Sequence, residues 1–187
     1  VATHTINRND RNALSAIAME AKENLALESF TVLVDKGYHN GREIETCKNN
    51  NITTIVAVPE QGKSNENGTQ PEYFVSNFSY NKADNTYTCP ENQVLTTTGS
   101  WHKKTGRTEE SGYQFQKYRT PKCKECPVKD LCTSRKGGRE IDRSQYADAV
   151  EENHQRYKDN PQRYRKRQEI NEHIFGTIKR KWGYNYT

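Results

Sequence analysis

Two carboxylates in this chain occupy settings that suit metal-dependent chemistry. Asp35 directly follows Phe30–Val34, a short β-branched apolar run that predicts a buried strand. Glu172 lies in a stretch of helical periodicity, two helical turns before Lys179, so both side chains can face one ligand. Carboxylates that converge from a strand and a helix can hold hard divalent ions for attack on a phosphodiester. The alternative is that Asp35 caps a turn and Glu172 makes a surface ion pair.

Four of the five cysteines form a second candidate site: Cys89, Cys123, Cys126 and Cys132. A Cys-x2-Cys turn can place two thiolates on one ion, and two more would complete a tetrahedral zinc site. The surrounding segment is poor in apolar residues, so a metal would help to stabilise it. Reduced cysteines without a ligand, or a disulfide, are the alternatives. The odd number of cysteines favours a reducing compartment. Cys47 falls on a predicted helix face and is expected to be a buried apolar residue.

The positive charge of the chain is concentrated near its C-terminus. The net charge is +5, and residues 151–187 hold nine Lys and Arg against five Asp and Glu. These cations could bind nucleic-acid phosphates, or they could form a solvated helix face. Only 31% of the residues are hydrophobic, which predicts a small core. No stretch approaches the roughly 20 apolar residues of a membrane span, so no membrane partner is expected.

The elements that must position these residues alternate between helix and strand. In chain order they are a helix over 11–27, a strand over 30–34, a helix over 40–49 and a strand over 52–58. Asp10 is expected to cap the first helix, and Ile44 and Cys47 to face inward from the second. Short strand–helix–strand connections imply parallel pairing in an α/β sheet. Functional groups gather at the carboxyl ends of such strands, where Asp35 lies.

The composition changes after Pro59, where a polar, turn-rich stretch begins. Beyond it, weak strand patterns cover 74–78, 85–88 and 94–98, and helices are predicted over 145–158 and 162–182. We therefore divide the chain into an α/β segment (1–58), a segment with the four-cysteine cluster (59–147) and a helical segment (148–187). The last helix carries an apolar stripe that includes Ile170.

Two motifs resemble those of DDE transposases from bacterial insertion sequences. Val32-Leu-Val-Asp35-Lys-Gly37-Tyr38 is similar to the second-aspartate motif of that family. Glu172-His-x-Phe-Gly176 is similar to its third-carboxylate helix. The family's Tyr–Arg–Glu–Lys signature is matched, with one additional residue between the Arg and the Glu, by Tyr164, Arg167, Glu172 and Lys179. The resemblance runs over nearly the whole chain, including the cysteine-bearing insertion.

The resemblance implies an α/β, RNase H-like fold, N-terminally truncated, with the cysteine-containing insertion before the last catalytic helix. It implies Mg²⁺- or Mn²⁺-dependent cleavage and strand transfer of DNA, with Asp35 and Glu172 as the second and third metal-binding carboxylates. Tyr164, Arg167 and Lys179 would contact the DNA backbone near the cut. The implied partners are transposon ends, target DNA and, at full length, further copies of the chain. The implied location is the nucleoid in a bacterial cytoplasm.

The first aspartate of the family's site has no counterpart here. In that family it lies on the first strand of the sheet, whereas Asp10 is the only acid upstream of Glu20 and is expected to be an N-cap. We therefore expect this chain to lack the first carboxylate and to be inactive alone. Two other interpretations stay open: a zinc-stabilised, non-catalytic nucleic-acid-binding module, and a decayed transposase remnant.

Overall fold

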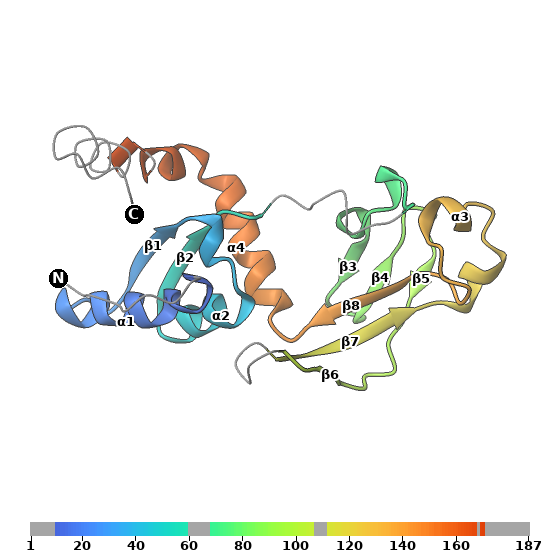
Figure 1. The fold of residues 1–187 in the computed structure, drawn as a ribbon, viewed down its shortest axis with the longest axis horizontal. Helices are drawn as coiled ribbons and strands as arrows, with labels where there is room; N and C mark the ends of the chain where they lie inside the picture. Colours follow the sequence, from blue (N-terminus) through green and yellow to red (C-terminus); the bar gives the residue numbers. More distant parts are fainter. Residues whose placement is uncertain (1–9, 60–67, 107–111, 168, 171–187) are drawn as a thin grey trace. The chain divides into compact units, whose positions relative to one another are not determined.

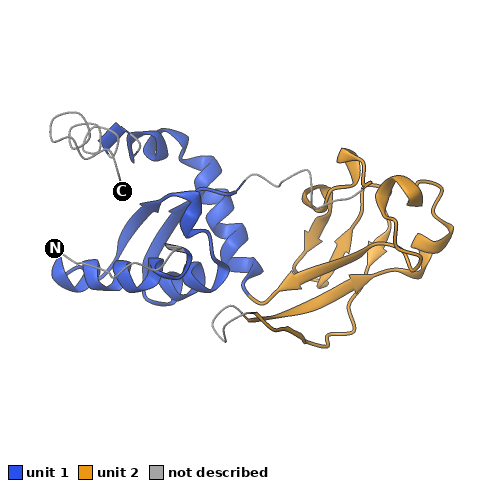
Figure 2. Ribbon diagram, viewed as in Figure 1, with its two compact units in different colours: residues 1–60, 146–187 blue, residues 61–145 orange. Residues whose placement is uncertain are grey.

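The chain has a mixed α/β fold that divides into two compact units (Figure 1; Figure 2). The computed structural model describes residues 10–59, 68–106, 112–167 and 169–170. Unit 1 consists of residues 1–60 and 146–187, and unit 2 of residues 61–145. Among the described residues, no helix has both the length and the apolar character needed to cross a membrane. The predicted strand tail at 1–6 lies outside the described residues.

Unit 1 contains the strand–helix alternation that the sequence predicts. Its main elements are α1 (Leu14–Asn24), β1 (Phe30–Val34), α2 (Gly41–Asn49), β2 (Ile52–Val56) and α4 (Ala147–Asp159). The two strands pair in parallel, as predicted from their short helical connection. The side chain of Asn40 accepts a hydrogen bond from the Arg42 amide and so fixes the start of α2. Ile44 and Cys47 are fully buried, which confirms the predicted inward face of this helix.

The first helix begins later than predicted, and its capping position is Ala13 and not Asp10. Asp10 opens a short 3-10 turn, and α1 starts after Ala13, which makes no side-chain cap. The Glu43 carboxylate of α2 takes the capping role instead. It accepts hydrogen bonds from the Ser15 amide at 2.8 Å and the Ser15 hydroxyl at 2.7 Å. A buried carboxylate at a helix N-terminus interacts favourably with the helix dipole, so Glu43 fastens α1 to α2.

Helix α4 is attached to the edge of β2 by hydrogen bonds from its polar side chains. Asn153 is fully buried, and its amide nitrogen donates to the Val56 carbonyl while its amide oxygen accepts from the Val56 amide. Arg156 donates from Nε to the Thr54 carbonyl at 2.9 Å. These bonds satisfy backbone groups that a further strand would otherwise pair. The C-terminal segment is therefore an integral part of the sheet's edge.

The strand that leads to Asp35 is less buried than its apolar sequence predicts. All five residues of β1 are partly buried, whereas four of the five residues of β2 are fully buried. Within the described residues β2 is the sole strand that pairs with β1. The opposite edge of β1 therefore has no strand neighbour in the described part of the chain, which accounts for the exposure.

Unit 2 consists of two three-stranded antiparallel sheets. Their strands are β3 (Ser79–Asn81), β4 (Thr86–Thr88), β5 (Val94–Leu95), β6 (His102–Lys104), β7 (Tyr113–Arg119) and β8 (Glu140–Ser144). The predicted strand over 74–78 is wrong, because this segment holds a 3-10 turn (Val75–Asn77) and the strand begins after it. Reciprocal backbone hydrogen bonds of 3.0 Å between Thr96 and Arg119 link the two sheets.

Aromatic side chains dominate the core of unit 2. Its buried members are Phe78, Tyr87, Leu95, Tyr118 and Ile141. The guanidinium of Arg143, itself 7% exposed, lies 3.7 Å from the centre of the Tyr80 ring and donates to the Tyr87 hydroxyl at 2.9 Å. A buried cation held by a ring face and a hydroxyl keeps its hydrogen bonding and gains cation–π attraction. Tyrosines thus supply the core that the low aliphatic content does not.

The hydrogen bonds between α4 and β2 predict a large effect of one substitution. Asn153→Ala would leave the buried amide and carbonyl of Val56 without partners, at about 1–3 kcal/mol for each group. We expect the free energy of unfolding to fall by about 2–5 kcal/mol in a urea titration. Gln155→Ala on the exposed side of the same helix is the control, with an expected change within roughly 0.5 kcal/mol. Equal effects of the two variants would contradict this role of Asn153.

Candidate functional site

Asp35 lies at the carboxyl end of β1, where the sequence places it. Its side chain is 59% exposed, and Oδ1 accepts a hydrogen bond from the Lys36 amide at 2.6 Å. This bond makes Asp35 the N-cap of a 3-10 turn (Lys36–Tyr38) that leads the chain away from the sheet. Asp35 therefore caps a turn, as one of the two interpretations of the sequence predicts. The exposed part of its carboxylate stays accessible to a ligand.

A second predicted residue, Arg167, lies beside Asp35. Residues 161–167 are helical, and Arg167 Nη2 is 4.0 Å from Asp35 Oδ1. The guanidinium carbon of Arg167 also lies 5.1 Å from the centre of the Tyr164 ring. Its Nε atom is buried and has no hydrogen-bond partner among the described residues. The fold therefore brings a cation from the C-terminal segment to the end of β1.

The Tyr164 ring is buried beside Arg167. Its ring is 8% exposed and packs with Ile55 and Ala57 in a small core, edge-on to Tyr157 at 4.9 Å between ring centres. Burial raises the pKa of Tyr164, and the nearby Asp35 carboxylate adds to this effect while Arg167 opposes it. The three side chains thus influence one another electrostatically. Because the buried ring is held in place by its neighbours, it is suited to positioning the Arg167 side chain.

The remaining predicted members of this site lie outside the described residues. These are Glu172 and Lys179. Ile170, the first residue of the predicted apolar stripe, is described and is 52% exposed. The structure therefore brings together Asp35, Tyr164 and Arg167, from the two separate segments that form unit 1.

An open hollow next to Tyr164 carries further positive charge. It has a volume of about 300 Å³ and is lined by Tyr157, Lys158, Pro161, Tyr164 and Arg165. Cations at the rim of an open surface are suited to contact with phosphate groups. This hollow extends the basic character of the site beyond Arg167.

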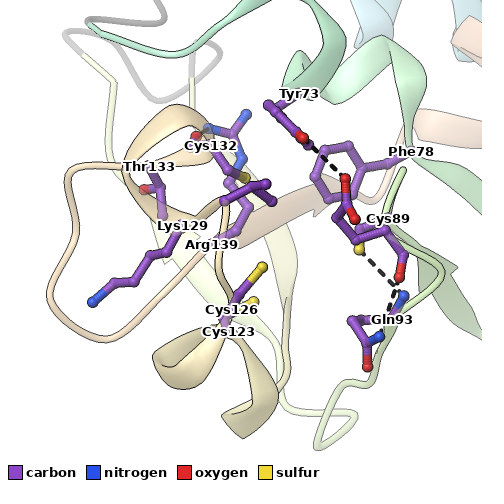
Figure 3. Close-up of a pocket in the computed structure, with 12 residues that line it drawn as sticks. Tyr73, Phe78, Cys89, Gln93, Cys123, Cys126, Lys129, Cys132, Thr133 and Arg139 are labelled. Carbon is purple, nitrogen blue, oxygen red and sulfur yellow. Dashed lines mark hydrogen bonds between the residues drawn. The ribbon is translucent and has the colours of Figure 1, made fainter.

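The four cysteines at positions 89, 123, 126 and 132 line one cavity in unit 2 (Figure 3). They come from three places: the end of β4, a 3-10 segment (Pro121–Glu125) with the residue after it, and the last residue of α3 (Lys129–Cys132). The cavity volume is about 20 Å³, enough for one water-sized sphere. All four are free thiols. In the part of the chain that the structure describes, no three His, Cys, Asp or Glu side chains stand close enough to share a metal ion.

The thiols of this cavity have polar and charged neighbours. The Cys89 sulfur accepts a hydrogen bond from the Gln93 amide at 3.3 Å. Burial raises the pKa of Cys132, whereas the nearby guanidinium of Arg139 lowers it. Charge on the other three sulfurs would raise the pKa of Cys132 as well, which reflects their proximity. The arrangement is thus a cluster of thiols beside a cation.

Gly138 has a structural role that the sequence does not reveal. Its φ angle is +92°, and a Cβ atom added there would overlap with the Cβ of Cys123. The chain before β8 therefore passes directly over Cys123, which needs a residue without a side chain. A Gly-Gly pair in the sequence predicts a turn, but it does not predict that the turn packs against Cys123. Arg139 and Tyr73 also line the cavity, and no pattern in the sequence predicts that they lie beside the cysteines.

The family model of the transposase DDE domain matches residues 88–187 of the chain. Because the match covers more than half of the sequence, the chain belongs to the transposase DDE domain family. This confirms the resemblance to DDE transposases. The matched residues include the four clustered cysteines, Tyr164, Arg167 and Glu172, whereas Asp35 lies before them. No curated protein and no solved structure matches the chain.

The close approach of Gly138 and Cys123 predicts opposite outcomes for two neighbouring glycines. Gly138→Ala would force the new methyl group into Cys123 and impose a left-handed backbone on alanine, so we expect a loss of roughly 1–3 kcal/mol in stability. The thiol at 123 should also react faster with a thiol reagent. Gly137→Ala meets no atom within 4 Å and should leave the melting temperature and the thiol reactivity unchanged. A harmless Gly138→Ala would disprove the contact.

Proposed function

We propose that this chain carries two of the three carboxylates of a DDE transposase active site, Asp35 and Glu172, in an RNase H-like core. The observation that carries this proposal is the contact between Asp35 and Arg167. Arg167 belongs to the signature segment that ends in Glu172, so its presence at the end of β1 supports convergence of the two carboxylates. The transposase family of the chain supports the same reaction class.

The residues at the end of β1 fit a divalent metal. Asp35 offers an exposed carboxylate at the end of a strand, and its ion pair with Arg167 is long, at 4.0 Å. Ion pairs between partly exposed groups contribute little to stability, so a doubly charged ion can replace the guanidinium as the partner of the carboxylate. Bound Mg²⁺ or Mn²⁺ would activate the attacking oxygen and stabilise the leaving oxygen in strand cleavage and transfer.

Arg167 and the adjacent cations would then act on the DNA. With the carboxylates occupied by metal, the Arg167 guanidinium is available for a phosphate oxygen, and Tyr164 holds its side chain in place. Lys158 and Arg165 at the basic hollow would bind neighbouring phosphates, as would Lys179. The partners in this proposal are transposon ends and target DNA, with a homo-oligomer forming at full length.

One edge of β1 has no strand neighbour among the described residues, and this edge has a place in the same proposal. In an RNase H-like sheet, the strand that bears the first aspartate would pair with β1 and bring its carboxylate beside Asp35. The partial burial of all five β1 residues fits an edge that accepts such a strand. This chain alone would therefore hold an incomplete carboxylate set and would not cut DNA.

Metal binding tests the carboxylate pair without requiring catalysis. We expect Mn²⁺, followed by its paramagnetic resonance signal, to bind to the purified chain and to bind at least about tenfold more weakly to Asp35→Asn and to Glu172→Gln. Loss of a charged ligand of this kind is worth more than about 1.4 kcal/mol, the equivalent of tenfold. Asp142→Asn, an exposed acid on β8, is the matched control and should bind like the parent chain.

Two results would count against the active-site proposal. Mn²⁺ binding that is indifferent to both carboxylate substitutions would support a non-catalytic nucleic-acid-binding module or a decayed remnant. Separately, Mg²⁺-dependent cleavage of plasmid DNA by the purified chain would overturn the expected inactivity. If that cleavage disappeared in Asp35→Asn, the carboxylate pair would stand and a further acid in this chain would complete the set.

For unit 2 we propose that the four clustered cysteines hold a structural zinc ion. Thiols from three segments line one small cavity, and a tetrahedral Zn²⁺ accepts four such groups as thiolates. The sulfurs would have to draw together on binding, which couples metal uptake to the packing of the segment around α3. The guanidinium of Arg139, which donates to the Cys132 carbonyl at 3.3 Å, would offset the negative charge of the thiolates.

Metal analysis tests the zinc proposal directly. We expect about one zinc ion per chain after purification, and Co²⁺ in its place should give the absorption bands of a tetrahedral thiolate site. Replacing Cys123 or Cys126 by Ser should abolish retention of the metal and lower the melting temperature. Cys47→Ala is the matched control, since Cys47 is buried in unit 1 and its pKa is raised by burial to about 12. Four reactive thiols with no effect of added Zn²⁺ would refute the site.

A further inference from the structure

The outer face of the β6–β7–β8 sheet is aromatic and basic, although it belongs to no hydrophobic core. Side chains of a strand alternate between its two faces, so Tyr118 points into the core while Tyr113 and Phe115 point away from it. The register places Phe115 opposite His102 and Tyr113 opposite Lys104. Neither Tyr113 nor Phe115 is a member of the three cores found among the described residues.

The rings on this face form a connected row. The Phe115 ring centre lies 5.6 Å from that of His102 and 6.1 Å from that of Tyr113. Lys117 Nζ lies 5.8 Å from the Phe115 ring centre, and Lys104 Nζ lies 5.7 Å from the Tyr113 ring centre. Aromatic rings thus alternate with ammonium groups on this face. The two strands that carry them, β6 and β7, are neighbours in the sheet (Figure 1).

The charge of these strands suits a polyanion. Strands β6 and β7 contain Lys103, Lys104, Lys117 and Arg119 and no acidic residue. The acids opposite them lie on β8, and Glu140 there is already bound to Lys117 at 2.9 Å and to Arg135 at 3.0 Å. These two cations hold the pKa of Glu140 below its usual value, so it stays ionised and paired. The sheet edge formed by β6 therefore remains positive.

We propose that this outer face binds unpaired bases of single-stranded DNA. Bases would stack on Phe115, Tyr113 and the exposed Trp101 that precedes β6, while Lys104 contacts phosphates. The proposal takes DNA as the partner from the transposase family of the chain. It adds a second DNA-binding surface, in unit 2, that is independent of the carboxylates.

Two physical arguments favour an unpaired strand over other partners. A duplex keeps its base faces stacked inside, and its major groove admits a helix or a two-stranded ribbon but not a three-stranded sheet face. The centre of a protein–protein interface is depleted of lysine, whereas this face carries Lys104 and Lys117 beside its rings. Unpaired bases have open π-faces and a charged backbone, so they complement both components of the surface.

Binding of labelled oligonucleotides to the whole chain, without added Mg²⁺ or Mn²⁺, tests this proposal apart from catalysis. We expect oligo-dT of about 12 nucleotides, a length typical of one stacking domain, to bind more tightly than an abasic strand of equal length and charge. Phe115→Leu removes the ring but keeps an apolar side chain, and should weaken binding of oligo-dT at least about fivefold. Phe115→Trp restores a ring and should retain the affinity.

Further variants separate a binding effect from a folding effect. Trp101→Leu alters a side chain that is 52% exposed, so it should reduce binding without lowering the melting temperature. Val94→Ala, an apolar side chain of similar exposure on β5, is the control and should bind normally. Equal binding of oligo-dT and the abasic strand would overturn the proposal. So would Phe115→Leu if it altered self-association of the chain and not DNA affinity.

Discussion

The two hydrogen bonds between the Asn153 side chain and the Val56 backbone make unit 1 a single body. The sheet comes from the N-terminal part of the chain and α4 from the C-terminal part, with unit 2 in between. An amide side chain that both donates and accepts is the natural cap for a strand edge, because it copies the pairing of a neighbouring backbone. Because these hydrogen bonds fix α4 against β2, the helical residues 161–167 lie at the end of β1 and Arg167 lies beside Asp35.

Local patterns in the sequence were sufficient for the elements that surround Asp35. The apolar runs of β1 and β2, the helical pattern between them and the short connections specify a parallel pair. The carboxyl end of the strand then positions Asp35. Family motifs added Tyr164 and Arg167, which the structure places near Asp35, although their roles in DNA binding remain proposals.

Features that depend on distant partners could not be predicted from the same patterns. Glu43 has the sequence setting of an ordinary helix acid, and its cap on Ser15 exists only once α1 and α2 have packed. Strands β6 and β7 were not predicted, because β6 contains no apolar residue and Gln and Lys separate the aromatic residues of β7. Their outer face packs against no core, so hydrophobic patterning has no reason to mark it. The buried Arg143 among tyrosines is equally invisible to a hydropathy scale.

The split of unit 1 around residues 61–145 has a consequence for biosynthesis. A ribosome adds roughly 5–20 residues per second, so about 5–18 s pass between completion of β2 and the appearance of α4. During this interval the Val56 edge of the nascent sheet has no cap and can recruit other extended chains. Unit 2 contains all of its own strands and can fold in the meantime. The order of translation therefore favours early folding of unit 2 and late completion of unit 1, and it makes the growing N-terminal sheet a candidate for binding by chaperones.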